Sequence, residues 1–263
     1  MLPILFELGP ITIYSFGLIL AVGFLVSLFV IYQEAKKEYL DEEKVFDTVF
    51  ISLLSALIGC RLFYIIEHFD TFGFSLLNWI LINAKPGMSL WGGIGIGLAV
   101  YLLSLKQKKL PLYKMLEIIT IPGALLSIFG EMGSFLSGNE IGTPTNLPWG
   151  VIYFSTLKRH PVGLYKALVS LLVLLILLRL RPIYNKKRIP TGSLFFTFVV
   201  IESFLLFLIT FCKEETSVIA NTLKADQLIY LVLFLVGGIL LYKRIGRSFK
   251  SDLLLLKKSI NIK

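Results

Sequence analysis

The chain has 263 residues, of which 56% are hydrophobic and 16% charged, and its formal net charge is +9. This composition leaves too little charged surface for a soluble globule, and no hydrophilic block is long enough to form a second domain. We therefore expect a single transmembrane domain over residues 1–263, in which the positive charge reflects topology and attraction to anionic lipid rather than nucleic-acid binding.

Seven apolar stretches follow one another along the chain, separated by charged gaps. At about 1.5 Å per residue, most of them are long enough to cross a hydrocarbon core of about 30 Å as a helix, and the shorter two need flanking residues or little tilt. The stretches cover residues 11–32, 45–66, 88–105, 116–136, 164–178, 192–211 and 228–242. The sequence therefore predicts an all-α integral membrane protein with seven transmembrane helices.

Lysine and arginine alternate between the gaps. The gaps after the first, third and fifth stretches carry 3, 4 and 5 of these residues, and the tail at 243–263 carries 7. The other gaps carry only one or two each, and none precedes the first stretch. Because cytoplasmic loops are rich in Lys and Arg, we expect an outward N-terminus, an extracytoplasmic loop at 131–161 and a basic cytoplasmic tail at 243–263.

Cysteine and histidine are scarce. Cys60 and Cys212 lie within or at the end of apolar stretches, and His68 and His160 are the only histidines. This pattern indicates neither a disulfide framework nor a metal site, so we expect no metal and no cofactor.

Ionisable residues inside the apolar stretches are candidates for function, because a charge at mid-depth in a bilayer costs about 2.5 kcal/mol or more. Counting from the helix ends places Arg61 and Glu131 at a similar depth near the outer face. Two interpretations remain open. These residues either pair and hold helices together, or they line an outward-facing polar cavity.

Three glycine-rich or basic segments converge on the same outer side: Trp91–Gly97, Gly130–Gly142 and Arg159–Pro161. Glycines allow a close approach of the backbone, either to a ligand or to a neighbouring helix. The run at Gly92–Gly97 is not a nucleotide fingerprint, because it lacks the required strand-turn-helix context.

These segments carry a resemblance to a known family. In order, spacing and topology the chain resembles the bacterial prolipoprotein diacylglyceryl transferases. The matching motifs are Gly9–Gly17, Gly59–Tyr64, Gly92-Gly93, Gly130–Gly142, Pro148-Trp149, Arg159–Pro161 and Leu164–Leu168. The resemblance implies transfer of the diacylglyceryl group of phosphatidylglycerol to the lipobox cysteine of lipoprotein precursors, at the outer face of the bacterial inner membrane. The implied partners are this phospholipid and the precursor peptide.

The resemblance also implies roles for individual residues. His160 is the expected base, since an ordinary histidine pKa of about 6.5 permits proton acceptance at neutral pH, and Glu131 is the second expected catalytic residue. The residues expected to bind lipid and phosphate are Arg61, Arg159, Lys213, Ser134, Asn139 and Gln227. Residues expected to shape the cavity are Trp91, Gly92, Gly93, Gly130, Gly133 and Gly142.

Several positions depart from the family pattern. Trp91 stands where the family carries a histidine, Glu131 where it carries an arginine, and Lys166 where it carries a glutamate. A carboxylate at position 131 would repel a phosphodiester at close range, and Lys166 is a candidate for the partner change that accommodates Glu131. Two functions therefore stand side by side: a divergent, active transferase, or a non-catalytic relative that binds a phospholipid or lipopeptide in the same cavity. A small transporter is disfavoured, because the chain shows no paired half-repeats.

Overall fold

The computed structural model describes residues 2–8, 11–74, 79, 87–153, 157–214, 218–219 and 223–246. Its contacts group the chain into two compact units, one formed by Met1–Val30 with Leu116–Lys263 and the other by Ile31–Met115. We describe each unit by itself and call them the first and the second unit.

The first unit begins with an antiparallel hairpin of β1 (Ile4–Leu8) and β2 (Ile11–Tyr14), followed by α1 (Ser15–Lys37), whose last seven residues belong to the second unit. The prediction of a helix from residue 11 was therefore wrong at its start. Ile11–Tyr14 is rich in β-branched and aromatic residues, which favour an extended strand. The helix starts where the fully buried Ser15 hydroxyl donates to the carbonyl oxygen of Leu2.

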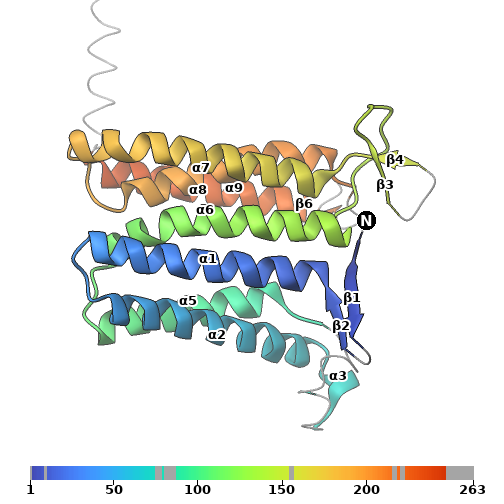
Figure 1. Ribbon diagram of the computed structural model, residues 1–263, viewed down its shortest axis with the longest axis horizontal. Helices are drawn as coiled ribbons and strands as arrows, with labels where there is room; N and C mark the ends of the chain where they lie inside the picture. The colour runs from blue at the N-terminus through green and yellow to red at the C-terminus, as the bar shows by residue number, and fades with distance from the viewer. Residues whose placement is uncertain are drawn as a thin grey trace, which may run out of the picture. The chain divides into compact units, whose positions relative to one another are not determined.

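Four further long helices complete this unit, and Figure 1 shows them running alongside one another. They are α6 (Leu112–Ser137), α7 (Val162–Lys186), α8 (Ser193–Ile209) and α9 (Ala225–Arg244), with the 3-10 turn η1 (Thr210–Cys212) extending α8. The fully or nearly buried core residues are Ile121, Ala124, Val173, Leu174, Leu177 and Leu194, contributed by α6, α7 and α8. This core packs α6, α7 and α8 against one another, and α9 packs along α8. Ion pairs between Glu140 and Lys166 and between Lys213 and Asp226 show that α7 and α9 begin at the end of the bundle where α6 and α8 finish.

Loops at that end of the bundle are tied together by backbone pairing. The connection between α6 and α7 contains the two-residue strands β3 (Val151–Ile152) and β4 (Lys158–Arg159), and β5 (Val218–Ile219) pairs with β6 (Leu223–Lys224) before α9. An isolated bridge joins Gly142 to Lys213. The loop after α6 and the loop after α8 are thereby fixed against each other.

The second unit is built on α2 (Glu42–Glu67), the short α3 (Phe69–Phe72) and α5 (Leu90–Gln107). Glycines let α2 and α5 pack closely: a Cβ atom added at Gly59 would lie 2.7 Å from the Gly92 carbonyl oxygen and 2.8 Å from Ile96 Cβ. At the N-terminus of α2, the Asp41 side chain accepts a hydrogen bond from the Lys44 backbone at 3.1 Å. Its pKa is lowered first by the Lys44 side chain and then by this backbone bond.

Six of the described helices are long and apolar enough to cross a membrane: Ser15–Lys37, Glu42–Glu67, Leu112–Ser137, Val162–Lys186, Ser193–Cys212 and Asp226–Arg244. Large apolar side chains such as Leu25, Phe29 and Ile58 lie more than half exposed on their surfaces, which suits a lipid environment. The chain is therefore an all-helical, multi-pass membrane protein apart from its short hairpins. The remaining predicted stretch, the third one at residues 88–105, is also helical from Leu90 onward, as α5.

Some boundaries differ from those expected. α6 continues to Ser137, so Glu131 and Ser134 lie on a helix, as the predicted stretch 116–136 has them, and the loop predicted at 131–161 begins only after Ser137. α7 continues past residue 178 to Lys186, because Arg179 and Arg181 are good helix formers that extend the apolar segment. The tail at 243–263 is described only as far as Gly246.

Candidate functional site

A cluster of charged side chains lies at the end of the first unit where α7 and α9 begin. Its centre is Lys166, whose side chain is only 3% exposed and whose Nζ donates to Glu140 Oε1 at 2.5 Å. The same Nζ lies 6.0 Å from the centre of the Tyr230 ring. Glu140 comes from the loop just after α6, so this pair connects that loop to α7.

Lys213 extends the charged cluster beyond Glu140. Its Nζ lies 3.7 Å from Glu140 Oε1 and 2.5 Å from Asp226 Oδ2 at the start of α9. Partial burial disfavours the charged form of Lys213, but the bond to Asp226 and the charge of Glu140 outweigh it and raise its pKa. Lys213 therefore stays charged through the neutral range. The Lys224 Nζ closes the cluster by donating to the carbonyl oxygens of Thr210 and Lys213.

Gln227, expected to bind lipid, supports the start of α9. It is 4% exposed, and its Oε1 accepts a hydrogen bond from the Lys224 backbone at 3.1 Å. This is the reciprocal half of a capping arrangement, which satisfies an otherwise unpaired backbone donor at a helix start.

Glu131 lies on α6, six residues before the helix ends, and is half-buried. Its charge interacts with those of Lys166, Lys213, Glu140 and Glu202. Among the described residues it forms neither a hydrogen bond nor an ion pair. Position 131 thus faces the charged cluster, and Lys166 carries the nearby positive charge that the sequence suggested.

Arg61 belongs to the second unit, on α2, and has its partners there. Its Nε and Nη1 donate to the carbonyl oxygens of Trp79 and Gly87 at 2.9 and 3.0 Å, and its guanidinium lies 5.1 Å from the centre of the Phe72 ring. These bonds hold the chain that follows α3 against α2. They satisfy a side chain that is 8% exposed, as burial of a guanidinium requires.

Arg159 and His160 lie where β4 leads into α7. Arg159 donates to the Gly142 carbonyl oxygen at 3.0 Å and pairs with Glu214, and its side chain is 16% exposed. The His160 backbone donates to Thr143 at 3.1 Å. Both residues therefore help to join the loop after α6 to the loop after α8.

The His160 ring belongs to a short chain of hydrogen bonds. Its Nδ1 lies 3.2 Å from the Tyr165 hydroxyl, which accepts a bond from Trp149 Nε1 at 2.8 Å. If Nδ1 carries the proton and donates to Tyr165, then Nε2 is left as a proton acceptor. The arrangement is compatible with the expected role of His160 as a base.

Tyr153, after β3, brings a hydroxyl group toward the charged cluster. That hydroxyl is buried and has no hydrogen-bond partner among the described residues. Burial, followed by the charges of Glu140 and Tyr165, raises the pKa of Tyr153 to about 12. The group therefore keeps its proton at neutral pH and remains a hydrogen-bond donor.

The remaining predicted site residues have mixed roles. The Ser134 carbonyl oxygen accepts bonds from Ser137 Oγ at 3.0 Å and from the exposed Asn139 at 3.2 Å, which ends α6. Gly133 packs on Phe16, since an added Cβ would lie 3.2 Å from its ring, whereas Gly130 has open space within 4 Å.

The other predicted glycines are packing positions. A Cβ at Gly142 would collide with the His160 backbone, and Gly92 and Gly93 face α2. Trp91 is the second residue of α5, and its side chain lies outside the described residues.

The charged cluster includes residues that sequence reasoning did not select: Glu140, Tyr153, Lys224, Asp226 and Tyr230. A signal was available for two of them, because Glu140 and Asp226 are carboxylates beside the predicted positions Asn139 and Gln227. Their pairing with Lys166 and Lys213 joins residues 26 and 13 positions apart, which no local pattern indicates.

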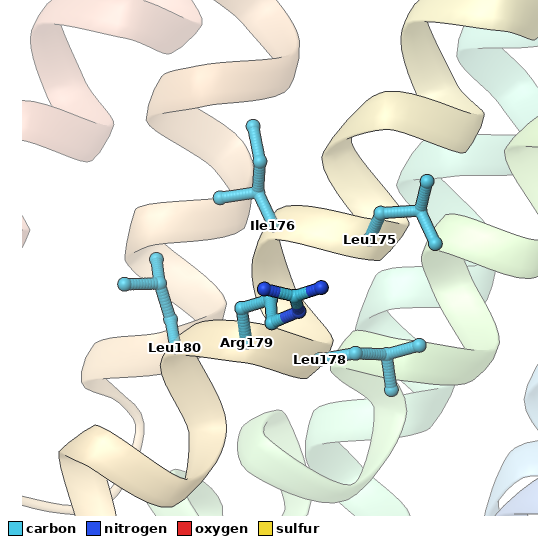
Figure 2. A pocket seen from close by; sticks show the side chains of 5 residues that line it. All are labelled: Leu175, Ile176, Leu178, Arg179 and Leu180. Atoms are coloured by element: carbon cyan, nitrogen blue, oxygen red, sulfur yellow. The ribbon is translucent and has the colours of Figure 1, made fainter.

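A shallow hollow elsewhere on α7 does not belong to this cluster. Figure 2 shows it lined by Leu175, Ile176, Leu178, Arg179 and Leu180. It begins about two and a half turns beyond Lys166, and its lining is almost wholly apolar. It therefore suits lipid contact rather than chemistry.

Fold and cluster together define a class of protein: a multi-pass membrane protein with buried, paired charges at one end of its helices. The family model for prolipoprotein diacylglyceryl transferase matches residues 3–243, so the chain belongs to this family. The resemblance seen in the motifs is confirmed.

Similar proteins align over almost their whole length. A protein of Finegoldia magna is 28% identical over 247 residues, covering 94% of this chain and 97% of the relative. Proteins of Clostridium tetani and Geobacter sulfurreducens are 29% and 30% identical, covering 90% and 89% of this chain and 95% and 92% of the relatives. All three bear the name phosphatidylglycerol–prolipoprotein diacylglyceryl transferase.

Proposed function

We propose that this chain is an enzyme of the bacterial cytoplasmic membrane that transfers a diacylglyceryl group from a glycerophospholipid to the cysteine thiol of lipoprotein precursors. The donor in the names of its relatives is phosphatidylglycerol. The observation that carries the proposal is the match of the family model over residues 3–243. The charged cluster supports it by supplying cations at one end of the helix bundle.

The chemistry requires a thiolate and a stabilised leaving group. The thiolate forms a bond to the terminal glyceryl carbon, the bond from that carbon to the phosphate oxygen breaks, and the departing phosphate ester gains a negative charge. His160 is the proposed acceptor of the thiol proton, through Nε2. Lys166 and Lys213 are the proposed sources of positive charge for the phosphate. Arg159, just before the start of α7, is a third proposed source.

We further propose seven spans with the N-terminus outside and the C-terminus in the cytoplasm. α5, with 18 residues, is about 27 Å long and so nearly matches the hydrocarbon core. The regions 33–44, 106–115 and 179–191, which contain the last residues of α1, α5 and α7 and the turns after them, carry most of the Lys and Arg outside the tail. This charge favours the cytoplasm for these regions. Because the cluster lies at the opposite end of α7 from Lys186, this topology assigns it to the outer face.

Reconstituted protein tests the proposed activity. With phospholipid vesicles and a lipobox peptide, we expect the peptide to gain the mass of one diacylglyceryl group. The variant His160→Ala should lose at least about a hundredfold in rate, the size typical of a lost general base. His68→Ala is the matched control, since that histidine caps the end of α2 in the second unit. A folded wild-type protein that never modifies the thiol would contradict the proposal.

A second function remains, that of a non-catalytic relative that binds a phospholipid or lipopeptide. This function is favoured by the ion pairs of the two lysines, since Lys166 and Lys213 each lie 2.5 Å from a carboxylate oxygen and their charges are already compensated within the chain. Expression of this chain in cells depleted of their own transferase distinguishes the two functions. Restored growth supports the transferase, whereas a well-expressed protein that retains bound lipid but does not restore growth supports the non-catalytic lipid-binding protein.

A further inference from the structure

The apolar hollow on α7 contains a cation that the chain itself does not pair. Arg179 lines the hollow, and Figure 2 shows its side chain among the apolar side chains around it. It is exposed, and within the described residues its side chain forms no hydrogen bond and no ion pair. Because a charge on a membrane-spanning helix is costly without a partner, this side chain favours an anion from outside the chain.

A second cation lies on the same face of α7. Lys186 follows Arg179 by seven residues, which is two helical turns or about 10 Å, and it is the last residue of the helix. It is likewise exposed, with no side-chain partner among the described residues. Two unpaired cations therefore lie along one side of the helix end.

An exposed apolar stripe leads along α7 to Arg179. Leu168, Leu172 and Leu175 precede it at spacings of four, three and four residues, which keeps them on its face, and they are 55%, 49% and 53% exposed. From Leu168 to Arg179 the stripe measures about 16 Å. One leaflet of a hydrocarbon core about 30 Å thick has nearly the same depth, so the stripe matches an acyl chain in length.

We propose that this face of α7 binds one anionic phospholipid, with an acyl chain along the apolar stripe and the hollow and the phosphate at Arg179 and Lys186. The guanidinium presents a fork of donors that fits phosphate oxygens. A zwitterionic headgroup would bring its own ammonium group toward the two cations and be repelled. The charge therefore selects the anionic class.

The lipid site is separate from the charged cluster of the proposed function. Arg179 follows Lys166 by 13 residues, about 20 Å along α7. The topology proposed above assigns the lipid to the cytoplasmic leaflet, at the opposite end of the helix from the cluster.

Photolabelling of the purified full-length chain in detergent tests the site. The probes are phosphatidic acid and phosphatidylcholine, each with a diazirine in one acyl chain, and mass spectrometry of peptides locates the label. Phosphatidic acid is anionic but lacks the headgroup glycerol of the donor implied for the transfer. We expect it to label residues 168–176 about tenfold more strongly than phosphatidylcholine, the size of one hydrogen bond to a charged group.

Variants assign the preference to the residue. Arg179→Gln should reduce it to about twofold or less, whereas Arg179→Lys, which keeps the charge, should retain most of it. Both variants should fold, because Arg179 is exposed and has no partner among the described residues. Lys36→Gln is the matched control, since it removes the same charge from an exposed position in the last turn of α1 and should leave the preference unchanged.

Three outcomes overturn the inference. They are equal labelling of α7 by the two lipids, a folded Arg179→Gln protein with the full preference, and a dimeric protein whose α7 neither lipid labels, because a second copy would then cover this face. Photolabelling requires no turnover, so a failure of the transfer assay leaves the lipid site standing, and loss of the site leaves the proposed transferase untouched.

Discussion

Lys166 shows how a single buried charge is stabilised at the end of this helix bundle. Its side chain is almost fully buried and its partner Glu140 is 17% exposed. Such a pair adds little net stability compared with apolar residues of similar size, but removing one partner leaves the other charge buried and uncompensated. The effect of a mutation here depends on whether both charges are removed.

We predict that Lys166→Met destabilises the first unit by about 3 to 5 kcal/mol, the cost of breaking a buried pair from one side. The double variant Lys166→Met with Glu140→Gln should recover most of this loss. Thermal unfolding of protein in detergent measures both, with Lys158→Met as the control at an exposed lysine of β4. Equal losses in the single and double variants would show that the pair is not the cause.

The raised pKa of Lys213 predicts how the stability of the folded protein depends on pH in the alkaline range. Despite partial burial, its bond to Asp226 and the charge of Glu140 raise its pKa in the folded protein. A raised pKa stabilises the folded state fully below the pKa of the unfolded chain, and this contribution is lost as pH rises through the folded value. Relative to Lys213→Gln, the wild-type protein should therefore lose its advantage only above pH 10.5, the ordinary lysine pKa. Melting temperatures of the two proteins measured from pH 7 to pH 12 check this, and a difference that vanishes below pH 9 would contradict it.

At the scale of elements, glycine determines how closely α2 and α5 pack. The side of α5 that faces α2 carries Gly92, Gly93 and Gly97, whereas a Cβ atom added at Gly95 would meet nothing within 4 Å. Without a hydrophobic driving force between helices in lipid, such close contact supplies much of their attraction. The glycine run thus has a structural function in the second unit.

We predict that Gly59→Ala destabilises the protein by about 1 to 3 kcal/mol, the usual cost of overpacking, because the new Cβ would lie 2.7 Å from a backbone oxygen of α5. Gly95→Ala should be neutral or slightly stabilising, since it removes a glycine from a helix without a clash. Thermal unfolding in the same detergent compares the two variants. If both are equally harmful, the close contact at Gly59 is not responsible.

The sequence predicted the positions of the helices correctly but placed the start of the first helix too early, and each outcome has a physical cause. It predicted seven helices from apolar length, and all seven regions are helical, because length and hydropathy are local properties. It extended the first helix through Ile11–Tyr14, which pairs with β1 instead. Strand pairing depends on a partner elsewhere in the chain, so an apolar run alone did not distinguish the strand from a helix.

For the whole molecule, the proposed topology is testable. We predict that a periplasmic reporter enzyme, active only outside the cytoplasm, is active when inserted at Asn146 and inactive when inserted at Lys109 or Arg188. The reason is the concentration of Lys and Arg in residues 106–115 and 179–191, which contain the last residues of α5 and α7 and the turns after them. Activity at Lys109 or Arg188, with silence at Asn146, would reverse the orientation and place the charged cluster on the cytoplasmic side.

Composition and motif order were sufficient to identify a multi-pass membrane protein and its family, because hydropathy is a sum over neighbouring residues and motifs are stretches of neighbouring residues. The partners of the ionisable residues were decided only by the tertiary structure. It pairs Lys166 with Glu140, gives Arg61 backbone partners in the second unit, and leaves Glu131 facing the cluster without a direct bond. Each of these outcomes depends on which distant segments of the chain meet within a unit, and electrostatic pairing acts over distances in space rather than along the chain.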